Sequence, residues 1–382
     1  MSFNPFLPEM RTDPYPAYRR LREEDPVHYS EVIRSWVLTR HDDVLAFFSD
    51  DKQLSSDRRK AKKYQGPRTD GLAGFQSDGP QHTRYRNLTT KAFSPRVIDG
   101  MRTRIEAIVD DLLSRFDGEA DLISGFARPL PMTVISEILG VPASDHERFH
   151  RWGHDFAMST DHAYKGLGGE AGPEMARYFA KLVPERRREP RDDLITQLIL
   201  TREDGDSLDD GEIISALVSL LFAGHETTVN LIGNGMLSLL RDRDQFERVA
   251  NEAVARPAVE ELLRYESPAQ IISRSAVCDV DFGGKTIREG DSVIGLLGAA
   301  NRDPDVFAHP DGLDVTREPN PHVAFGHGVH FCIGAMLSRL EGRIAIPALV
   351  HRFPNMKLES DEADWRDTAV LRGLSSLCVR LR

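Results

Sequence analysis

Residues 321–343 read PHVAFGHGVHFCIGAMLSRLEGR and carry the strongest functional signal in the chain. The single cysteine of this stretch, Cys332, follows a segment rich in glycine, and an apolar helical pattern starts directly after it. Gly326, Gly328 and Gly334 keep side chains away from the sulfur, so the backbone can approach a flat group closely. The N–H groups at the start of the following helix favour a thiolate at this position.

Three active roles compete for the cysteine sulfur. Structural zinc needs four ligands in compact paired spacings, and no second cysteine accompanies His322, His327 and His330. A nucleophilic thiolate needs a base that is held by a third group, and the sequence leaves this role open. An axial thiolate on haem iron fits best, because Phe325 and Phe331 add apolar cover that keeps water away. A buried structural cysteine is the usual explanation for a lone cysteine, but it does not account for the whole arrangement.

Composition limits the class of protein. The chain has 382 residues, 40% hydrophobic residues and a net charge of -11, which is typical of a water-soluble protein with a full core and argues against nucleic acid as the main partner. Three cysteines far apart in sequence indicate a reducing compartment. The N-terminus does not resemble a signal peptide, and the longest apolar run, residues 213–224, has the length of a buried helix. We therefore expect a cytoplasmic protein without a membrane segment.

Periodicity predicts a mainly α protein with a small antiparallel β region, organised as one large domain over residues 1–382. The α-rich part covers about residues 81–265 and 332–350, including the amphipathic pattern MRTRIEAIVDDLLSRF. The β-rich part covers about residues 27–40, a hairpin, and 271–297, where Gly-Gly and Glu-Gly turns separate short strands.

The segment FGHGVHFCIG resembles the haem-binding loop of the haem-thiolate monooxygenases, the cytochrome P450 family. Phe325, Gly328, His330, Cys332 and Gly334 all fall on this highly specific motif. The similarity to soluble bacterial members extends over nearly the whole chain. It implies the cytochrome P450 fold, haem b as cofactor and Cys332 as the iron ligand.

The stretch AGHETT, residues 223–228, places an acid and two hydroxyls inside an apolar helical pattern that begins at an aspartate cap. The ordinary explanation is an exposed patch or a local salt bridge, because an unpaired buried carboxylate is costly. The stretch resembles the oxygen-activating segment of the family. This resemblance implies that Ala223 and Gly224 lie against the haem, that Thr227 hydrogen-bonds dioxygen and that Glu226 supplies protons.

Two sets of charged residues match supports of the haem in the family. Glu261 and Arg264 are spaced i, i+3 in EELLRY, and an exposed pair of this kind is worth about 0.2–0.5 kcal/mol. The resemblance implies that this pair is buried and braces the segment under the haem. The cations that match the ligands of the haem propionates are His82, Arg86, Arg274 and His330. Each of them alone would more commonly form a surface salt bridge.

The resemblance also implies a mostly apolar substrate pocket. Its expected positions are Leu72, Phe75, Phe222, Ala223, Gln270, Ile271, Ile272 and Leu374. This lining suits a polyketide, a terpenoid, a peptide or an aromatic secondary metabolite, and it does not choose among them. The stretch KGLGGEAGPEM, residues 165–175, falls where the family has a mobile lid.

We therefore expect a monomeric monooxygenase that hydroxylates or epoxidises an apolar small molecule with dioxygen. The sequence shows no fused flavin or iron–sulfur segment, so a separate ferredoxin and reductase would supply electrons. The alternatives are a peroxide-driven peroxygenase and a non-catalytic haem domain that recruits a carrier protein. The acid–threonine pair Glu226–Thr227 argues against both.

An acidic ferredoxin would need a local positive patch on this acidic chain. The candidate cations are Arg84, Lys91, Arg102, Arg104, Arg339 and Arg343, unless they pair with nearby acids such as Glu106 or Glu341.

Overall fold

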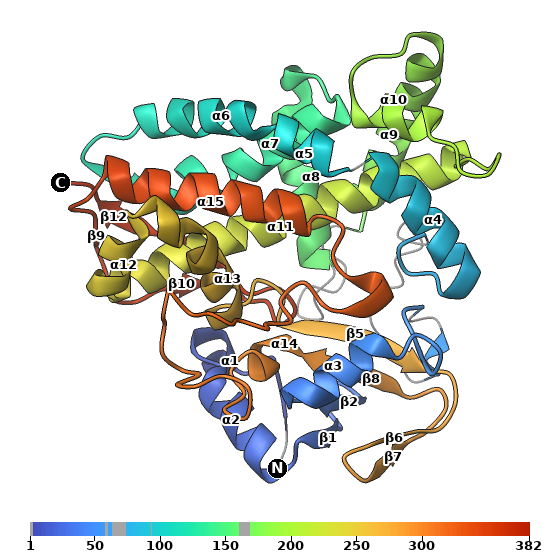
Figure 1. Cartoon of the computed structure of the whole chain (residues 1–382), viewed down its shortest axis with the longest axis vertical. Coiled ribbons are helices and arrows are strands. Elements are labelled where there is room, and N and C mark those ends of the chain that lie inside the picture. Colours follow the sequence, from blue (N-terminus) through green and yellow to red (C-terminus); the bar gives the residue numbers. More distant parts are fainter. Residues whose placement is uncertain (1–2, 58–59, 63–73, 93, 160–168) are drawn as a thin grey trace.

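The computed structural model describes residues 3–57, 60–62, 74–92, 94–159 and 169–382. A helical region and a β-rich region lie against each other, and the long helix α11 (Asp210–Arg241) runs through the middle of the molecule (Figure 1). In this view most helices lie above α11, and the largest sheet lies below it with the N-terminal helices. The expected mainly α fold with a small β region is confirmed.

Helix α11 forms the centre because its sequence is apolar on nearly all sides. The predicted aspartate cap is Asp209: its carboxylate accepts the backbone N–H of Glu212, and the Glu212 carboxylate accepts the backbone N–H of Asp209. By length and composition alone α11 is able to cross a membrane, but 61% of its most apolar stretch is buried inside the protein. We therefore interpret it as the core helix.

Most of the other helices surround α11 and form the helical region, while α1, α2, α3 and α14 lie beside the main sheet (Figure 1). Helix α6 corresponds to the amphipathic pattern predicted from the sequence. The helices are α1 (Pro8–Thr12), α2 (Tyr15–Glu24), α3 (His41–Ser49), α4 (Gly79–Ala92), α5 (Pro95–Gly100), α6 (Arg102–Ser114), α7 (Pro129–Leu139), α8 (His146–Ser159), α9 (Ala171–Arg188), α10 (Leu194–Leu200), α12 (Arg243–Val249), α13 (Ala255–Tyr265), α14 (Leu297–Ala300) and α15 (Ala335–Arg352).

The main sheet has the strand order β1-β2-β8-β5-β3. The expected hairpin is formed by β1 and β2, and β5 is antiparallel to both β8 and β3. The pairing of β2 with β8 is parallel, which the sequence did not predict. The strands are β1 (Val27–Ser30), β2 (Ser35–Leu38), β3 (Leu54–Ser55), β4 (Glu119–Asp121), β5 (Ile271–Ala276), β6 (Val280–Phe282), β7 (Lys285–Ile287), β8 (Ser292–Leu296), β9 (Lys357–Leu358), β10 (Asp364–Trp365), β11 (Leu374–Ser376) and β12 (Cys378–Arg380).

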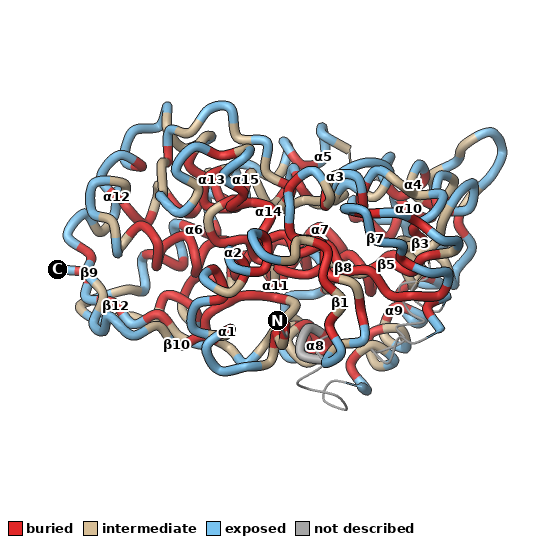
Figure 2. The backbone as a smooth tube through the Cα atoms, turned by 90° about the horizontal axis from the view of Figure 1, so that it is seen from below, coloured by how far each residue is buried: buried red, intermediate tan, exposed pale blue. Residues whose placement is uncertain are grey.

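Burial follows this arrangement. Figure 2 shows buried backbone along α11 and the strands of the main sheet, and exposed backbone at the periphery. One apolar cluster joins the helices around α11, and two smaller clusters cover the main sheet. The space between the helical region and the sheet is where the candidate site lies.

Candidate active site

A cavity of about 360 Å³ lies between α11, α15, strand β5 and the loop that carries Cys332. It brings together side chains from segments far apart in the sequence. The residues predicted from the sequence that line it are Phe75, His82, Arg86, Ala223, Gly224, Thr227, Ile272, Arg274, Phe325, His330, Cys332 and Gly334. The structure therefore places most of the predicted cofactor-binding residues around one space.

Two glycines shape the loop before Cys332. Gly326 and Gly328 have φ angles of 69° and 70°, a region that only glycine adopts without strain. A Cβ atom on Gly328 would lie 3.0 Å from the carbonyl oxygen of Phe48. Gly334 differs, because its φ of -81° is ordinary and an added Cβ would lie 3.9 Å from the Cys332 sulfur. Gly334 thus keeps space open beside the sulfur and does not permit an unusual backbone.

The surroundings of the Cys332 sulfur suit a thiolate ligand. Burial raises the pKa of the thiol above its ordinary value, although the backbone N–H of Gly334, the charges of Arg86 and Arg339, and the backbone N–H of Ala335 act in the opposite direction. These N–H groups belong to the start of α15, as the sequence predicted. When a metal replaces the thiol proton, which is released to solvent, the thiolate that results is stabilised by these donors.

Two arginines and two histidines, Arg86, Arg274, His82 and His330, lie together in the cavity wall. The rings of His82 and His330 have centroids 3.9 Å apart. Burial lowers the pKa of Arg274 to about 10 and that of His330 to about 3, and it also lowers the pKa of His82 and Arg86. Buried His82 Nε2 has no hydrogen-bond partner in the described part of the chain. The positive charges of Arg86 and Arg274, together with the N–H groups of the two histidines, fit a group with two negative charges.

The donor set therefore fits a haem. A sulfur ligand lies in the wall of the cavity, and the cationic cluster of His82, Arg86, Arg274 and His330 is suited to two carboxylates. Among the described residues, no group of three or more histidine, cysteine, aspartate or glutamate side chains is arranged to hold a metal ion. The site therefore suits a metal that an organic ligand already binds, as the porphyrin binds iron in haem.

A sequence profile described as Cytochrome P450 matches residues 167–369. Cytochrome P450 107B1 from Saccharopolyspora erythraea is 43% identical over 96% of this chain and 95% of its own length. The chain belongs to the cytochrome P450 family. PksS from Bacillus subtilis, a polyketide biosynthesis cytochrome P450, is 39% identical over 100% of this chain and 99% of its own. A solved structure of PksS matches with a TM-score of 0.92 and covers 99% of both chains.

A second solved structure extends this comparison. P450BioI in complex with an acyl carrier protein ligated to hexadec-9Z-enoic acid matches with a TM-score of 0.89 at 36% identity. It covers 98% of this chain and 99% of its own. With these relatives, the protein is a haem-dependent oxidoreductase of the monooxygenase class.

In this P450, the predicted acid and threonine lie on different sides of α11. Thr227 lines the cavity, and its hydroxyl donates a 2.8 Å hydrogen bond to the carbonyl of Ala223. Glu226 is not part of the cavity wall and forms a buried ion pair with Arg366. Its second carboxylate oxygen lies 3.7 Å from Nδ1 of His225. Of the two ordinary explanations for an acid in this helix, the salt bridge is therefore the correct one. Its partner Arg366 was not predicted, because a single arginine near the C-terminus has no periodic signal.

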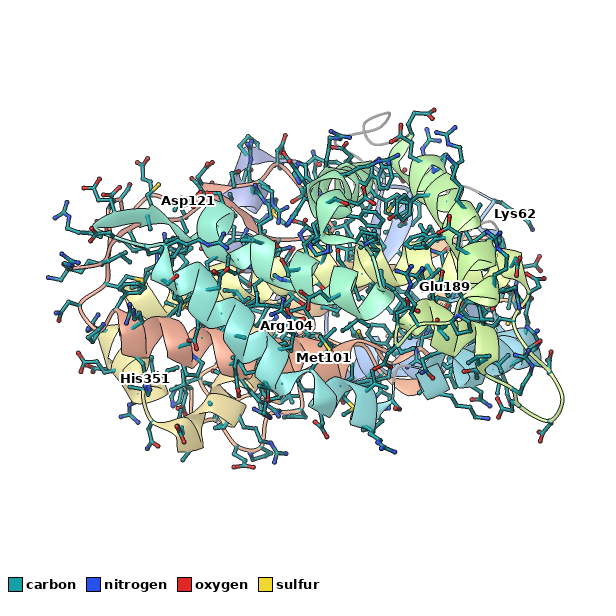
Figure 3. All side chains as sticks on the ribbon, turned by 90° about the horizontal axis from the view of Figure 1, so that it is seen from above. Lys62, Met101, Arg104, Asp121, Glu189 and His351 are labelled. Atoms are coloured by element: carbon teal, nitrogen blue, oxygen red, sulfur yellow. The ribbon has the colours of Figure 1, made fainter. Side chains whose placement is uncertain are left out.

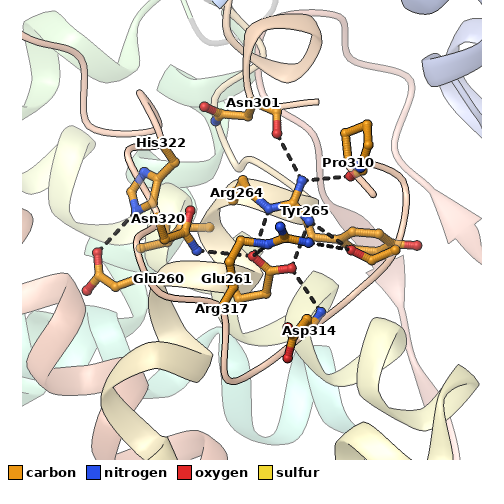
Figure 4. A network of polar contacts seen from close by, with 12 residues as sticks. Glu260, Glu261, Arg264, Tyr265, Asn301, Pro310, Asp314, Arg317, Asn320 and His322 are labelled. Atoms are coloured by element: carbon orange, nitrogen blue, oxygen red, sulfur yellow. Dashed lines mark hydrogen bonds and ion pairs between the residues drawn. The ribbon is translucent and has the colours of Figure 1, made fainter. Parts of the chain in front are cut away.

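The brace predicted in EELLRY is buried. Glu261 and Arg264 are both 0% exposed, and two guanidinium nitrogens of Arg264 each lie 2.7 Å from a carboxylate oxygen of Glu261 (Figure 4). Arg264 also donates to three backbone carbonyls, those of Asn301, Pro310 and Gly312. This pair therefore ties α13 to the chain that leads into the cysteine loop.

Two further members of the brace were not predicted. Arg317 Nε and Asn320 Nδ2 each donate a 3.0 Å hydrogen bond to a carboxylate oxygen of Glu261 (Figure 4). Both residues belong to irregular chain with no helical or strand pattern. The only signal available was the concentration of polar residues in DVTREPNPH just before the cysteine loop.

Four predicted pocket residues lie outside the cavity wall. Phe222 packs edge-on against Phe156 with ring centroids 4.8 Å apart. Side chains alternate along a strand, so Ile271 faces away from the cavity that Ile272 lines. The side-chain amide of Gln270 donates a 2.8 Å hydrogen bond to the backbone carbonyl of Ser267.

The fourth of these residues, Leu374, is 1% exposed and belongs to the main apolar cluster. Leu72 and residues 165–168 of the expected lid lie outside the described residues. Apolar wall positions that were missed include Ile135, Leu220 and Leu297. Leu220 was recognisable, because it lies three residues before Ala223 and seven before Thr227 on one helix face.

The six predicted docking cations all have acidic partners, which weakens the positive patch. Arg84 pairs with Asp206 and with Glu212 at 2.6 Å, and Arg104 on the outer surface of α6 (Figure 3) pairs with Glu137. The other pairs are Lys91 with Glu203, Arg102 with Glu106, and Arg339 and Arg343 with Glu260.

Proposed function

We propose that this P450 holds haem b through the Cys332 sulfur and inserts one oxygen atom from dioxygen into an apolar small molecule. The haem supplies the activation of dioxygen when it is bound. The observation that carries the proposal is the position of Cys332 in the cavity wall, next to the N–H groups that begin α15. These groups and the nearby arginines favour the thiolate form that the chemistry requires.

The cationic cluster would hold the two propionates. Arg274 and His82 are 2% and 3% exposed, so an anion beside them gains strong charge-assisted hydrogen bonds. The unpartnered Nε2 of His82 supports this role. The Glu261–Arg264 brace would keep the cysteine loop in place when the haem binds.

Thr227 and Glu226 would take part in proton transfer in the cavity. The Thr227 hydroxyl is a polar group that α11 presents to the cavity, near Ala223 and Gly224. Glu226 lies one residue before it and is held by Arg366, so we propose that the carboxylate leaves Arg366, takes up a proton from solvent water and passes that proton on towards the cavity.

The substrate and partners follow from the cavity wall and the relatives. Ile135, Leu220 and Leu297 give an apolar wall, which suits an apolar small molecule. Because the PksS relative is named for polyketide biosynthesis, we propose a substrate from secondary metabolism. We further propose a cytoplasmic monomer that receives electrons from a separate ferredoxin.

A ferrous carbonyl spectrum tests the proposal. The wild-type protein with haem should absorb at the long wavelength that thiolate ligation produces, and Cys332→Ser should lose this band. Retention of the band in Cys332→Ser would exclude Cys332 as the ligand. A screen of apolar metabolites for shifts of the haem band would then identify the substrate class.

A further inference from the structure

Glu260 is the shared hydrogen-bond acceptor of two arginines and a histidine. Its carboxylate accepts hydrogen bonds from Arg339 at 2.8 Å through both Nε and Nη2, from His322 Nε2 at 3.1 Å and from Arg343 Nη2 at 3.4 Å. Although burial raises the pKa of Glu260, the hydrogen bonds from His322 and Arg339 lower it to about 2. The carboxylate is therefore charged throughout the working range of the enzyme.

Consecutive glutamates of α13 serve two separate networks. Figure 4 shows the Glu260 side chain directed towards His322, while Glu261 faces Arg264 and Arg317. Neighbouring residues of a helix point about 100° apart, which explains how one sequence motif supplies both. The Glu261 network holds the chain before the cysteine loop, and the Glu260 network reaches the loop itself.

Both main partners of Glu260 contact the loop that carries Cys332. The guanidinium of Arg339 lies over the ring of Phe325, 4.5 Å from its centre. The carbonyl of Phe325 accepts the backbone N–H of Cys332 at 3.0 Å. His322 accepts the backbone N–H of Ala324 at 3.2 Å through Nδ1. The Glu260 carboxylate therefore fixes the two groups that set the position of Phe325, and Phe325 in turn holds the backbone of Cys332.

We propose that Glu260 is a positioning residue for the cysteine ligand. It holds Arg339 on the Phe325 ring and His322 at the base of the loop, and it thereby keeps the Cys332 sulfur at a fixed distance from the haem iron. This inference rests on the proposed role of Cys332. An ordinary surface ion pair would contribute only to overall stability, whereas this one is connected to the sulfur through one ring and one backbone hydrogen bond.

The test compares Glu260→Gln with Glu137→Gln. Both changes remove a carboxylate that accepts two hydrogen bonds from one arginine, but Glu137 binds Arg104 on α6, away from the cysteine loop. The measurement is the rate at which the ferrous carbonyl complex of the haem-loaded protein loses its long-wavelength band in mild denaturant. We expect Glu260→Gln to lose this band roughly fivefold faster than wild type, as for loss of a charge-assisted hydrogen bond.

Glu137→Gln should keep the wild-type rate even if its unfolding midpoint falls. Arg339→Lys keeps the charge but loses the two-pronged contact, so its rate should lie between those of wild type and Glu260→Gln. Equal rates for Glu260→Gln and Glu137→Gln would overturn the positioning role while leaving Cys332 as the ligand. A wild-type protein without the long-wavelength band would instead overturn the proposed role of Cys332, and the inference with it.

Discussion

The Thr227 hydroxyl donates its hydrogen to the carbonyl of Ala223, 2.8 Å away in the preceding turn of α11. Because this hydrogen is committed to the helix, the oxygen faces the cavity as a hydrogen-bond acceptor. A proton-bearing species in the cavity can therefore be held at this position.

Thr227→Ala should uncouple electron use from product formation. The variant should consume reducing equivalents at a comparable rate but release peroxide, because the acceptor that holds the proton-bearing species is gone. Product formed per electron pair and peroxide are the quantities to measure. Ser219→Ala is the matched control, since the Ser219 hydroxyl donates a similar 2.7 Å hydrogen bond to the carbonyl of Ser215 on α11 but is not part of the cavity wall. Unchanged coupling in Thr227→Ala would remove Thr227 from the mechanism.

Breaking the buried brace should destabilise the fold strongly. Arg264→Ala removes two hydrogen bonds and a charge from Glu261 at 0% exposure but leaves Arg317 and Asn320 in contact with it, so we expect a cost of about 3 kcal/mol, the low end for loss of one partner of a buried pair. The free energy of unfolding in urea is the measurement. The control is Arg20→Ala, which removes the partner of Glu24 in an exposed i, i+4 pair of α2 and should cost about 0.5 kcal/mol or less. Similar losses in the two variants would show that the brace is not a buried ion pair in solution.

Glu341 gives a prediction of pH dependence. It is 1% exposed on α15, one of its oxygens has no hydrogen-bond partner in the described part of the chain, and burial raises its pKa well above its ordinary value of 4.5. Above pH 4.5 the unfolded chain loses this proton while the folded protein keeps it. The group therefore lowers stability progressively as the pH rises towards the folded-state pKa.

Glu341→Gln removes this titration and should be more stable than wild type, with a gain that grows between pH 5 and 8 by up to about 1.4 kcal/mol per pH unit. The difference between the two urea midpoints across this range is the measurement, because other titrating groups cancel in it. Glu359→Gln, which alters an exposed carboxylate, should show no such trend. A difference that does not change with pH would mean that Glu341 is ionised in the folded protein.

The sequence predicted the parts of the fold that have a periodic or motif-based signal. The Asp209 cap, the β1–β2 hairpin and the residues around Cys332 were all recognisable in this way. The parallel pairing of β2 with β8 joins strands far apart in the chain, and no local pattern encodes such a partner.

The same limit applies to the site. The motif EELLR identified Glu261, but Arg366, Arg317 and the Glu260 network depend on single side chains that meet only after folding. The pocket residues were predicted as short runs, although a strand directs alternate side chains to opposite faces. This is why Ile272 lines the cavity and Ile271 does not.

Exposed apolar residues around Cys332 suggest how the electron donor docks. Val329, Phe331 and Met336 are 50%, 38% and 43% exposed, and all lie within four residues of Cys332. The neighbouring side chains of Arg339 and Arg343 both form ion pairs with Glu260, which partly neutralises their positive charges. Electrons need a short path to the sulfur, so we expect the donor to cover this apolar patch of Val329, Phe331 and Met336 and to bind mainly by apolar contact.

Met336→Gln should therefore slow reduction by a ferredoxin several-fold while the haem spectrum stays unchanged. Leu200→Gln is the matched control: Leu200 is a 60% exposed apolar side chain at the end of α10, and its replacement should leave the rate unchanged. Because the nearby charges are already paired, the rate should depend only weakly on salt, whereas a charge-driven encounter slows steeply as the ionic strength rises. Stopped-flow reduction at several salt concentrations separates the two cases. A steep salt dependence with a normal rate for Met336→Gln would show that the donor is attracted by charge and docks elsewhere.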